Sequence, residues 1–349
     1  MASITSVNMV SSLTRPLLQT LRRAATPRQS RQWQQIRLSS HAASSPTLAA
    51  RGQKPVTIQT LQKMYTENKP ITMLTAHNFP SALMAQEAGM DMILVGDSIA
   101  MVSMGMNDTS EVTLDEMITS ARAVSRAVNR SFTVGDLPMG SYEISPEQAL
   151  ASAIRMVKEG RMQSVKLEGG AEMAPAIKKI TTAGIPLCAH IGLTPQRQHA
   201  LGGFRVQGNT LDKAMSLFKD AKAVEEAGAF AVVLECVPPD IAEEVTKALR
   251  IPTIGIGAGN KTSGQVLVQI DMLGIRPPDS FMPKFVKQYG SIWDAGLTAI
   301  KQYKDEVSDR SYPGPSHVYK SDARVTEAFK AAIKSIATPA CQPVDAQKA

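Results

Sequence analysis

Acidic and basic residues stand at the ends of short apolar runs in this 349-residue sequence. The runs end in Asp97-Ser98, Asp136, Lys166-Leu167-Glu168, His190 and Glu235. Side chains alternate between the two faces of a strand, and two positions before each polar residue there is a small or apolar one, except that Lys166 precedes Glu168. The alternation therefore predicts that these side chains point to one side of a sheet. Gly169 and Gly170 predict a tight turn directly after Glu168.

Four carboxylates that converge on one pocket repel one another and need compensating positive charge. Lys166 alone does not neutralise four acids, so the set predicts a bound divalent metal. Oxygen ligands favour Mg²⁺ or a similar hard ion, which takes few carboxylates and keeps water and substrate oxygens. Each acid taken alone could instead cap the loop after its strand, but five consecutive strands with such ends favour a site. His190 is either a general acid or base or a hydrogen-bonded structural histidine.

The surrounding pattern alternates apolar runs with helical segments. The runs predict strands at 71–76, 91–98, 131–138, 164–170, 186–192, 230–238 and 252–259, with an eighth in 266–275 near Asp271 to Gly274. Helical spacing covers 57–68, 81–88, 113–128, 146–159, 211–227 and 240–249. Eight strand–helix units predict a (β/α)8 barrel over residues 55–290, a fold that carries catalytic groups at the C-terminal ends of its strands. A doubly wound sheet is the rival, but we find no early phosphate-binding fingerprint of that class.

Two further segments have defined expectations. Residues 291–349 form a C-terminal extension in this interpretation, broken at Tyr312-Pro313-Gly314-Pro315, with a helix over 322–337 and a disordered tail in the last dozen residues. The string Gly255-Ile256-Gly257-Ala258-Gly259 either holds an anion through backbone amides or permits tight packing at a barrel end.

The positive charge of the chain, +7 in all, is concentrated in its first 50 residues, which hold six arginines and no lysine or acid. Removing those six from the 38 basic residues leaves 32 against 31 acids, and aromatic residues make up 5% of the chain, so a nucleic-acid surface is not expected. No apolar run reaches the roughly 18 residues of a membrane span. The Arg-, Ser-, Gln- and Ala-rich segment 1–50 predicts a mitochondrial transit peptide and a matrix location, with a disordered tail of chance composition as the alternative.

A series of motifs resembles the ketopantoate hydroxymethyltransferase family in order and spacing, from about Val56 to His317. They are Val95-Gly96-Asp97-Ser98, Gly135-Asp136-Leu137-Pro138, Val165-Lys166-Leu167-Glu168-Gly169-Gly170, His190-Ile191-Gly192-Leu193-Thr194-Pro195-Gln196, and Leu234-Glu235-Cys236-Val237-Pro238 followed by Gly255 to Gly259. The resemblance implies a (β/α)8 barrel, usually a homo-oligomer, that uses Mg²⁺. It implies transfer of a hydroxymethyl group from the co-substrate 5,10-methylenetetrahydrofolate to 3-methyl-2-oxobutanoate, giving 2-dehydropantoate in pantothenate biosynthesis.

Residue roles follow from the same resemblance. It implies Asp97 and Asp136 as metal ligands, with Glu168 in the metal's surroundings, either directly or through water. The implied substrate-binding residues are Asp97, Ser98, Asp136, Lys166 and His190. Glu235 is the implied base that removes the proton from C3 of the keto acid. A 2-keto acid can chelate Mg²⁺, which would polarise the ketone and stabilise the enolate that attacks the folate-borne methylene.

Three alternatives stay open at this point. Lys166 could form a Schiff base, although Glu168 beside it favours a protonated, poorly nucleophilic amine. The activity could be that of a Mg²⁺-dependent keto-acid lyase or aldolase on a related barrel, which needs no folate. A non-catalytic barrel is the third, but it predicts missing acids and all are present. The chain departs from the family at Asn78, where an aspartate is common, and at Phe281-Met282, where a histidine–isoleucine pair is common.

Overall fold

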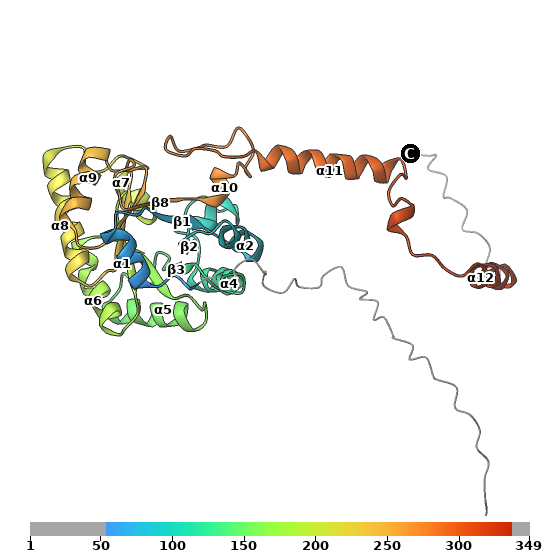
Figure 1. Cartoon of the computed structure of the whole chain (residues 1–349), viewed down its shortest axis with the longest axis horizontal. Helices are drawn as coiled ribbons and strands as arrows, with labels where there is room; N and C mark the ends of the chain where they lie inside the picture. The colour runs from blue at the N-terminus through green and yellow to red at the C-terminus, as the bar shows by residue number, and fades with distance from the viewer. Residues whose placement is uncertain (1–53, 337–349) are drawn as a thin grey trace, which may run out of the picture. The chain divides into compact units, whose positions relative to one another are not determined.

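A computed structural model of the chain describes residues 54–336. Within this range eight parallel strands close into a barrel in chain order, each paired with the next and β8 paired with β1 (Figure 1). The strands are β1 Ile71–Thr75, β2 Met92–Val95, β3 Phe132–Asp136, β4 Ser164–Glu168, β5 Leu187–Gly192, β6 Ala231–Glu235, β7 Thr253–Ile256 and β8 Gly264–Leu267. The predicted (β/α)8 barrel is confirmed, and its closure excludes the doubly wound alternative.

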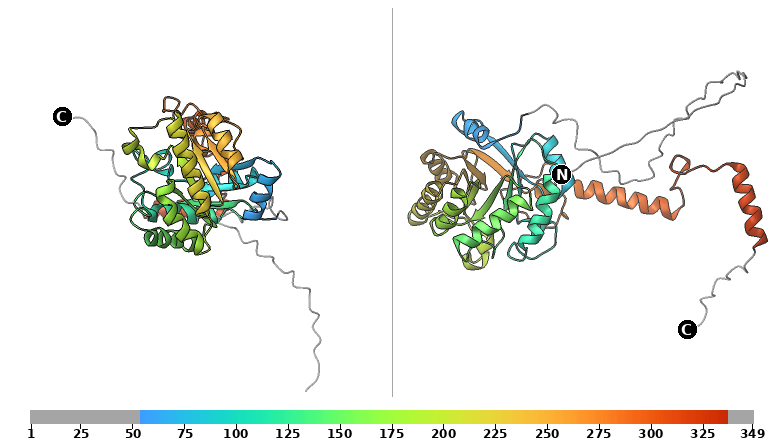
Figure 2. Two further views of the ribbon diagram at one scale, coloured as in Figure 1. Left: turned by 90° about the vertical axis from the view of Figure 1, so that its left-hand side faces the viewer. Right: turned by 90° about the horizontal axis from the view of Figure 1, so that it is seen from below.

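Helices cover the outside of the barrel, as both views in Figure 2 show. The longer ones are α2 Phe79–Glu87, α4 Leu114–Ser125, α5 Pro146–Lys158, α6 Ala174–Thr182, α8 Leu211–Glu226 and α9 Pro239–Ala248. The short ones are α3 Ile99–Val102, α7 Gln198–Leu201 and α10 Gln269–Met272, with 3₁₀ turns η1 Ala171–Met173, η2 Pro195–Arg197 and η3 Pro315–His317. No helix in the described range combines the length and the apolar character needed to cross a bilayer.

Local signals explain where these helices begin. Thr113 accepts the backbone N–H of Glu116, whose carboxylate accepts the backbone N–H of Thr113, so the two form a capping box at the start of α4. Asn78 caps α2 in the same way, accepting from the backbone N–H of Ser81 at 3.0 Å. The asparagine that departs from the family pattern therefore has a structural role.

Two apolar clusters hold the barrel together. Inside the barrel, residues such as Met92, Leu94 and Val134 pack with α1 (Ile58–Thr66), which contributes Leu61. Between sheet and helices, residues such as Val95 and Leu167 pack in a second, larger cluster. The inner cluster excludes water from most of the barrel, which leaves the strand ends as the place for polar side chains.

The predicted position of the eighth strand is wrong. β8 is Gly264–Leu267, whereas Asp271 to Gly274 lies in α10 and the turn that follows it. Backbone pairing rather than apolar character selects β8, since Gln265 is exposed and a Cβ at Gly264 would lie 2.4 Å from the carbonyl oxygen of Ile71. Moreover, residues 257–263 join β7 to β8 without a helix, so the seventh strand–helix unit lacks its expected helix.

Tight packing accounts for the glycines after β7. Gly257 has φ +63°, and a Cβ there would lie 2.7 Å from the ring of Phe285. A Cβ at Gly259 would lie 2.7 Å from the Cβ of Pro239. Of the two sequence interpretations of this string, the packing one explains these contacts.

Two helices lie in the C-terminal extension. α11 spans Ile292–Ser308, a helix that the sequence analysis did not predict, and α12 spans Ala323–Ser335, within the predicted 322–337. The predicted transit peptide at 1–50 and the predicted disordered tail lie outside the described residues. The C-terminal extension is described as far as Ile336.

Candidate active site

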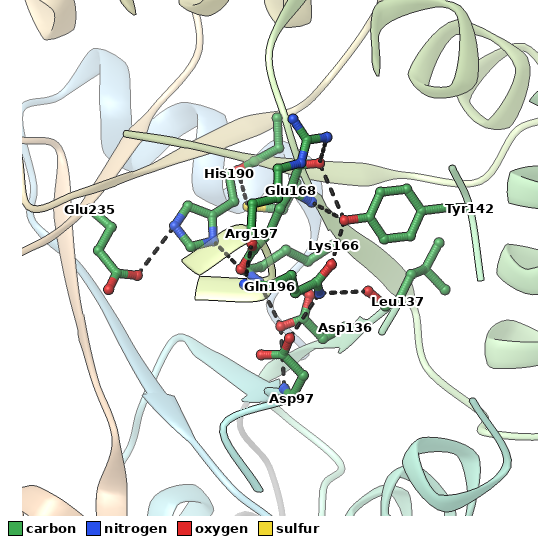
Figure 3. Close-up of polar contacts among 12 residues, drawn as sticks. Asp97, Asp136, Leu137, Tyr142, Lys166, Glu168, His190, Gln196, Arg197 and Glu235 are labelled. Carbon is green, nitrogen blue, oxygen red and sulfur yellow. Dashed lines mark hydrogen bonds and ion pairs between the residues drawn. The ribbon is translucent and has the colours of Figure 1, made fainter. Parts of the chain in front are cut away.

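Polar side chains gather at the C-terminal ends of strands β3 to β6, on the lumen side of the barrel (Figure 3). Asp136 ends β3, Lys166 and Glu168 come from β4, His190 from β5, and Glu235 ends β6. Two contacts in this group follow the strand pairing directly, because Asp136 is the register partner of Lys166 and Glu168 that of His190. The alternation argument holds for all five residues.

Asp97 reaches the same place by a different route. Val95 packs in the cluster between sheet and helices, so strict alternation would turn Asp97 away from the lumen. β2 ends at Val95, however, and the turn at Asp97 and Ser98 redirects the chain. The backbone N–H of Asp97 then donates to Oδ2 of Asp136 at 3.3 Å. The reason given for Asp97 from the sequence was wrong, although its side chain does join the group.

Lys166 and Asp136 form a buried ion pair. The ammonium nitrogen of Lys166 lies 2.7 Å from Oδ1 and 2.6 Å from Oδ2 of Asp136. Burial lowers the pKa of Lys166, but attraction to Asp136, Asp97 and Glu168 outweighs it and holds the pKa above its usual value. The surrounding carboxylates therefore favour the protonated ammonium of Lys166, which argues against its use as a Schiff-base nucleophile.

His190 lies between two carboxylates. Its Nδ1 is 3.4 Å from Oε1 of Glu168, and its Nε2 is 3.2 Å from Oε2 of Glu235. Neither contact has the alignment of a hydrogen bond, so the attraction is mainly between charges. Burial lowers the pKa of His190, but the neighbouring carboxylates, Glu168 first, raise it to about 9. At neutral pH the ring is an imidazolium.

Asp97 is the acid with the least compensation. Burial first, then repulsion from Asp136 and Glu168, raises its pKa well above the usual value. The side-chain amide of Gln196 donates to its Oδ2 at 2.8 Å, while Oδ1 receives none of the hydrogen bonds found among residues 54–336. Ser98 lies next to it, half-buried, at the start of α3. Asp97 therefore has an oxygen available for a further cation.

The turn after β4 lets the chain pass close to these groups. Gly169 has φ +129°, and a Cβ there would lie 2.5 Å from Cγ of Met173 and 2.8 Å from a guanidinium nitrogen of Arg197. A Cβ at Gly170 would lie 2.3 Å from the carboxylate carbon of Asp220. Glycine is therefore required at both positions of the predicted tight turn, because a Cβ at either one would collide with a neighbouring side chain.

The charge of the whole group fits a divalent cation. Four carboxylates (Asp97, Asp136, Glu168, Glu235) stand against two cations (Lys166, His190), which leaves two negative charges when all are ionised. In the described part of the chain no three His, Cys, Asp or Glu side chains are already arranged as a complete metal site. Mg²⁺ needs no such set, because one or two carboxylates with water and substrate oxygens suffice. Asp97 and Asp136 are neighbouring acids in this group, joined by the hydrogen bond from the Asp97 backbone to the Asp136 carboxylate.

Two residues of the site were not identified from the sequence. Gln196 is buried in η2, and its amide bonds Asp97, the carbonyl oxygen of Leu137, and Tyr142. Tyr142, in the loop after β3, is also buried and contacts the backbone of Glu168. Both lie outside strands, where alternation gives no direction. The position of Gln196 at the end of a family motif was the one available signal.

Comparison with known proteins gives a consistent result. Residues 55–315 match the family model described as ketopantoate hydroxymethyltransferase. A protein of Emericella nidulans named 3-methyl-2-oxobutanoate hydroxymethyltransferase is 62% identical over 298 residues, covering 85% of each chain. An Oleidesulfovibrio alaskensis protein of the same name is 52% identical, covering 71% of this chain and 86% of its own. A rice protein, 3-methyl-2-oxobutanoate hydroxymethyltransferase 2, mitochondrial, is 50% identical, covering 80% and 71% respectively.

Proposed function

Because the chain belongs to the ketopantoate hydroxymethyltransferase family, we propose that it is an enzyme that converts 3-methyl-2-oxobutanoate into 2-dehydropantoate. The hydroxymethyl group would come from 5,10-methylenetetrahydrofolate. The observation that carries the proposal is the group of six charged side chains, five of them buried, which lies within the matched residues at the strand ends where barrel enzymes act.

Lys166 is the residue suited to binding the keto acid. Its ammonium is held in place by Asp136 and is 4% exposed, so it offers a fixed positive charge without rearrangement. A carboxylate or developing enolate oxygen placed beside it would gain from a preorganised charge in a site that excludes water. Ser98, half-buried at the start of α3, could donate a hydrogen bond to the same substrate.

Asp97 and Asp136 would hold Mg²⁺, with Glu168 close enough to act directly or through a water. The ion, when bound, supplies Lewis-acid polarisation of the substrate ketone. The chain's own contribution is to hold the Asp97 carboxylate through Gln196 and the Asp136 carboxylate through Lys166.

Glu235 is suited to removing the C3 proton. Its side chain is 13% exposed, more than those of Glu168 and Asp136 at 1%, so it stands at the edge of the buried group where a substrate carbon can approach. The imidazolium of His190 contacts one oxygen of Glu235 at 3.2 Å and so fixes the carboxylate of β6, two strands along the barrel from Lys166 on β4. His190 therefore orients the base, and a contact with substrate is a second possible role.

One assay tests this function. Purified protein is given 3-methyl-2-oxobutanoate, 5,10-methylenetetrahydrofolate and Mg²⁺, and 2-dehydropantoate is measured by mass spectrometry. We expect product only when all three are present. Turnover of the keto acid without folate would support the lyase or aldolase alternative, and no product from the complete mixture would contradict the proposal.

We propose that the protein assembles as a homo-oligomer. α11 buries none of its residues, and one face carries Trp293, Leu297, Ile300 and Val307, each between 37% and 67% exposed. A soluble chain that leaves such a row of large apolar side chains open gains by covering it with a second copy. Analytical ultracentrifugation, with Ile300→Asp as the disrupting variant, tests this.

We also propose a domain division and a location. Residues 55–290 would be the catalytic domain, 291–349 the extension, and 1–50 a mitochondrial transit peptide directing the enzyme to the matrix. The location is supported by the acid-free, arginine-rich composition of 1–50 and by the mitochondrial names of two rice relatives, 50% and 48% identical.

A further inference from the structure

Gln196 makes hydrogen bonds to two carboxylates of the site, those of Asp97 and Glu168. Its side-chain nitrogen donates to Oδ2 of Asp97 at 2.8 Å and to the carbonyl oxygen of Leu137 at 3.0 Å. Its backbone N–H donates to Oε2 of Glu168 at 3.1 Å. One residue in η2 therefore fixes two carboxylates, one from the turn after β2 and one from the end of β4 (Figure 3).

The orientation of the Gln196 amide is determined from both sides. The carbonyl oxygen of Leu137 only accepts hydrogen bonds, so it requires the NH₂ group. On the other side, the hydroxyl of Tyr142 lies 2.5 Å from Oε1 of Gln196. That hydroxyl receives the backbone N–H of Glu168 at 3.3 Å and also lies 3.3 Å from the carbonyl oxygen of Glu168. Oε1 of Gln196 is the closer of its two acceptors, so the single proton is directed to Oε1. A flipped amide would oppose oxygen to oxygen at Leu137 and at Asp97.

The neutrality of this donor matters for the site. A lysine or arginine at position 196 would hold Asp97 equally well but would cancel the negative charge that attracts a cation. A glutamine amide stabilises the ionised carboxylate by hydrogen bonding and leaves the charge in place. Tyr142 is 1% exposed and Gln196 is 2% exposed, so water does not replace either contact easily.

We propose that Gln196, oriented by Tyr142, is a positioning residue that holds Asp97 and Glu168 in the arrangement that binds the metal. The inference rests on the metal role given to Asp97 under the proposed function. It adds a connection that runs from the backbone of β4 through Tyr142 and Gln196 to Asp97.

Metal affinity in the absence of substrates tests the inference separately from the reaction. Mg²⁺ binding is measured by calorimetry, and Mn²⁺ binding by electron paramagnetic resonance, for the wild-type chain, Gln196→Met and Tyr142→Phe. Gln196→Met removes one buried charge-assisted hydrogen bond, so its dissociation constant for the metal should be roughly tenfold to hundredfold larger than that of the wild type. Tyr142→Phe should weaken it by about threefold to tenfold, since Leu137 still orients the amide.

The double variant gives a sharper result. Because Tyr142 acts through Gln196, adding Tyr142→Phe to Gln196→Met should weaken metal binding no further. In the assay, Gln196→Met should raise the Mg²⁺ concentration needed for half-maximal rate, and excess Mg²⁺ should restore much of kcat. A general loss of structure would instead lower kcat at every Mg²⁺ concentration and lower the melting temperature.

Ser152→Ala is the matched control. The hydroxyl of Ser152, in α5, donates a buried hydrogen bond of 2.6 Å to the carbonyl oxygen of Ser141. Ser141 lies in the same loop as Tyr142, and Ser152 does not contact Gln196. The metal affinity of Ser152→Ala should equal that of the wild type.

Unchanged affinity in Gln196→Met would overturn the inference, as would absence of Mg²⁺ binding by the wild-type chain. If Gln196→Met does not fold, Tyr142→Phe decides, and wild-type affinity there contradicts the proposal. Failure of the transferase assay with normal metal binding would instead contradict the proposed function.

Discussion

The ammonium of Lys166 lies between the two carboxylate oxygens of Asp136, at 2.7 and 2.6 Å, and the two residues are opposite each other in the pairing of β3 with β4. One cation therefore serves both oxygens of the proposed metal ligand. In the proposed function Asp136 binds the metal and Lys166 the keto acid, so this ion pair would tie binding of the two together.

Replacing Lys166 by methionine should harm both substrate binding and stability. The keto-acid KM should rise by roughly one to two orders of magnitude, since a charge-assisted contact is lost. Asp136 would be left buried without its partner, which costs about 3–5 kcal/mol of unfolding free energy. Steady-state kinetics and urea unfolding measure these two effects, with Lys219→Met on the exposed side of α8 as the control.

Borohydride added with the keto acid should trap no adduct on the wild-type chain, and a trapped adduct at Lys166 would restore the Schiff-base alternative.

Glu235→Gln should separate proton removal from binding. The amide has the shape of the carboxylate but cannot take a proton, so exchange of the C3 proton with D₂O should fall by at least about a hundredfold. Keto-acid binding measured by calorimetry should stay within a few fold of wild type. Proton NMR follows the exchange, and Glu226→Gln, exposed on α8, serves as control. Retained exchange in Glu235→Gln would remove Glu235 from the role of base.

His190 predicts a loss of stability at alkaline pH. Its pKa is raised to about 9 in the folded chain, against about 6.5 for an unperturbed histidine, so folding favours the protonated ring. The contribution is complete below about pH 6.5 and disappears as the pH rises through about 9, with an upper limit of about 3 kcal/mol. Urea unfolding of metal-free protein at several pH values measures it. His190→Gln should flatten the profile in that window, whereas the exposed His199→Gln should not, and equal slopes in all three chains would contradict the assignment.

Asp97→Asn should uncouple stability from the metal. The raised pKa of Asp97 means that its ionised form is disfavoured in the folded chain, so stability from this group is present at low pH and is lost as the pH rises through the folded value. At neutral pH the metal-free Asn variant should therefore melt at the same temperature as the wild type or higher. Mg²⁺ at a hundred times its dissociation constant should add about 2.7 kcal/mol to the wild type and nothing to the variant. Equal stabilisation of both by Mg²⁺ would place the metal elsewhere.

Residues 1–50 should be sufficient to direct a reporter to mitochondria. Fluorescence microscopy of a fusion of this segment to a fluorescent protein tests it, with the six arginines replaced by glutamine as control. We expect matrix fluorescence from the first fusion and diffuse fluorescence from the second. Diffuse fluorescence from both would support the alternative that the segment is a tail of chance composition.

The sequence predicted the barrel because its strands are short, apolar and regularly spaced. The same rule failed at β8, where Gly264 is fixed by the approach of Ile71 rather than by burial of a side chain. It also missed α11, although Trp293, Leu297, Ile300 and Val307 recur there at helical spacing and form one apolar face.

Alternation similarly predicted five site residues and gave the wrong reason for Asp97. The direction of Asp97 depends on a turn, and the roles of Tyr142 and Gln196 depend on loops. Loop positions are set by contacts with distant strands, such as that of Tyr142 with Glu168, and no local pattern records those contacts.

The pairing of opposite charges on neighbouring strands has a consequence for how the barrel assembles. Asp136 meets Lys166, and Glu168 meets His190, only when β3, β4 and β5 align in their native register. A slip of one residue would turn these side chains toward the apolar layer beneath the helices and leave each charge buried alone, at a cost of several kcal/mol. The charged residues of the site thus also stabilise the native strand register over shifted ones. A barrel closed in the wrong register would be unstable as well as inactive.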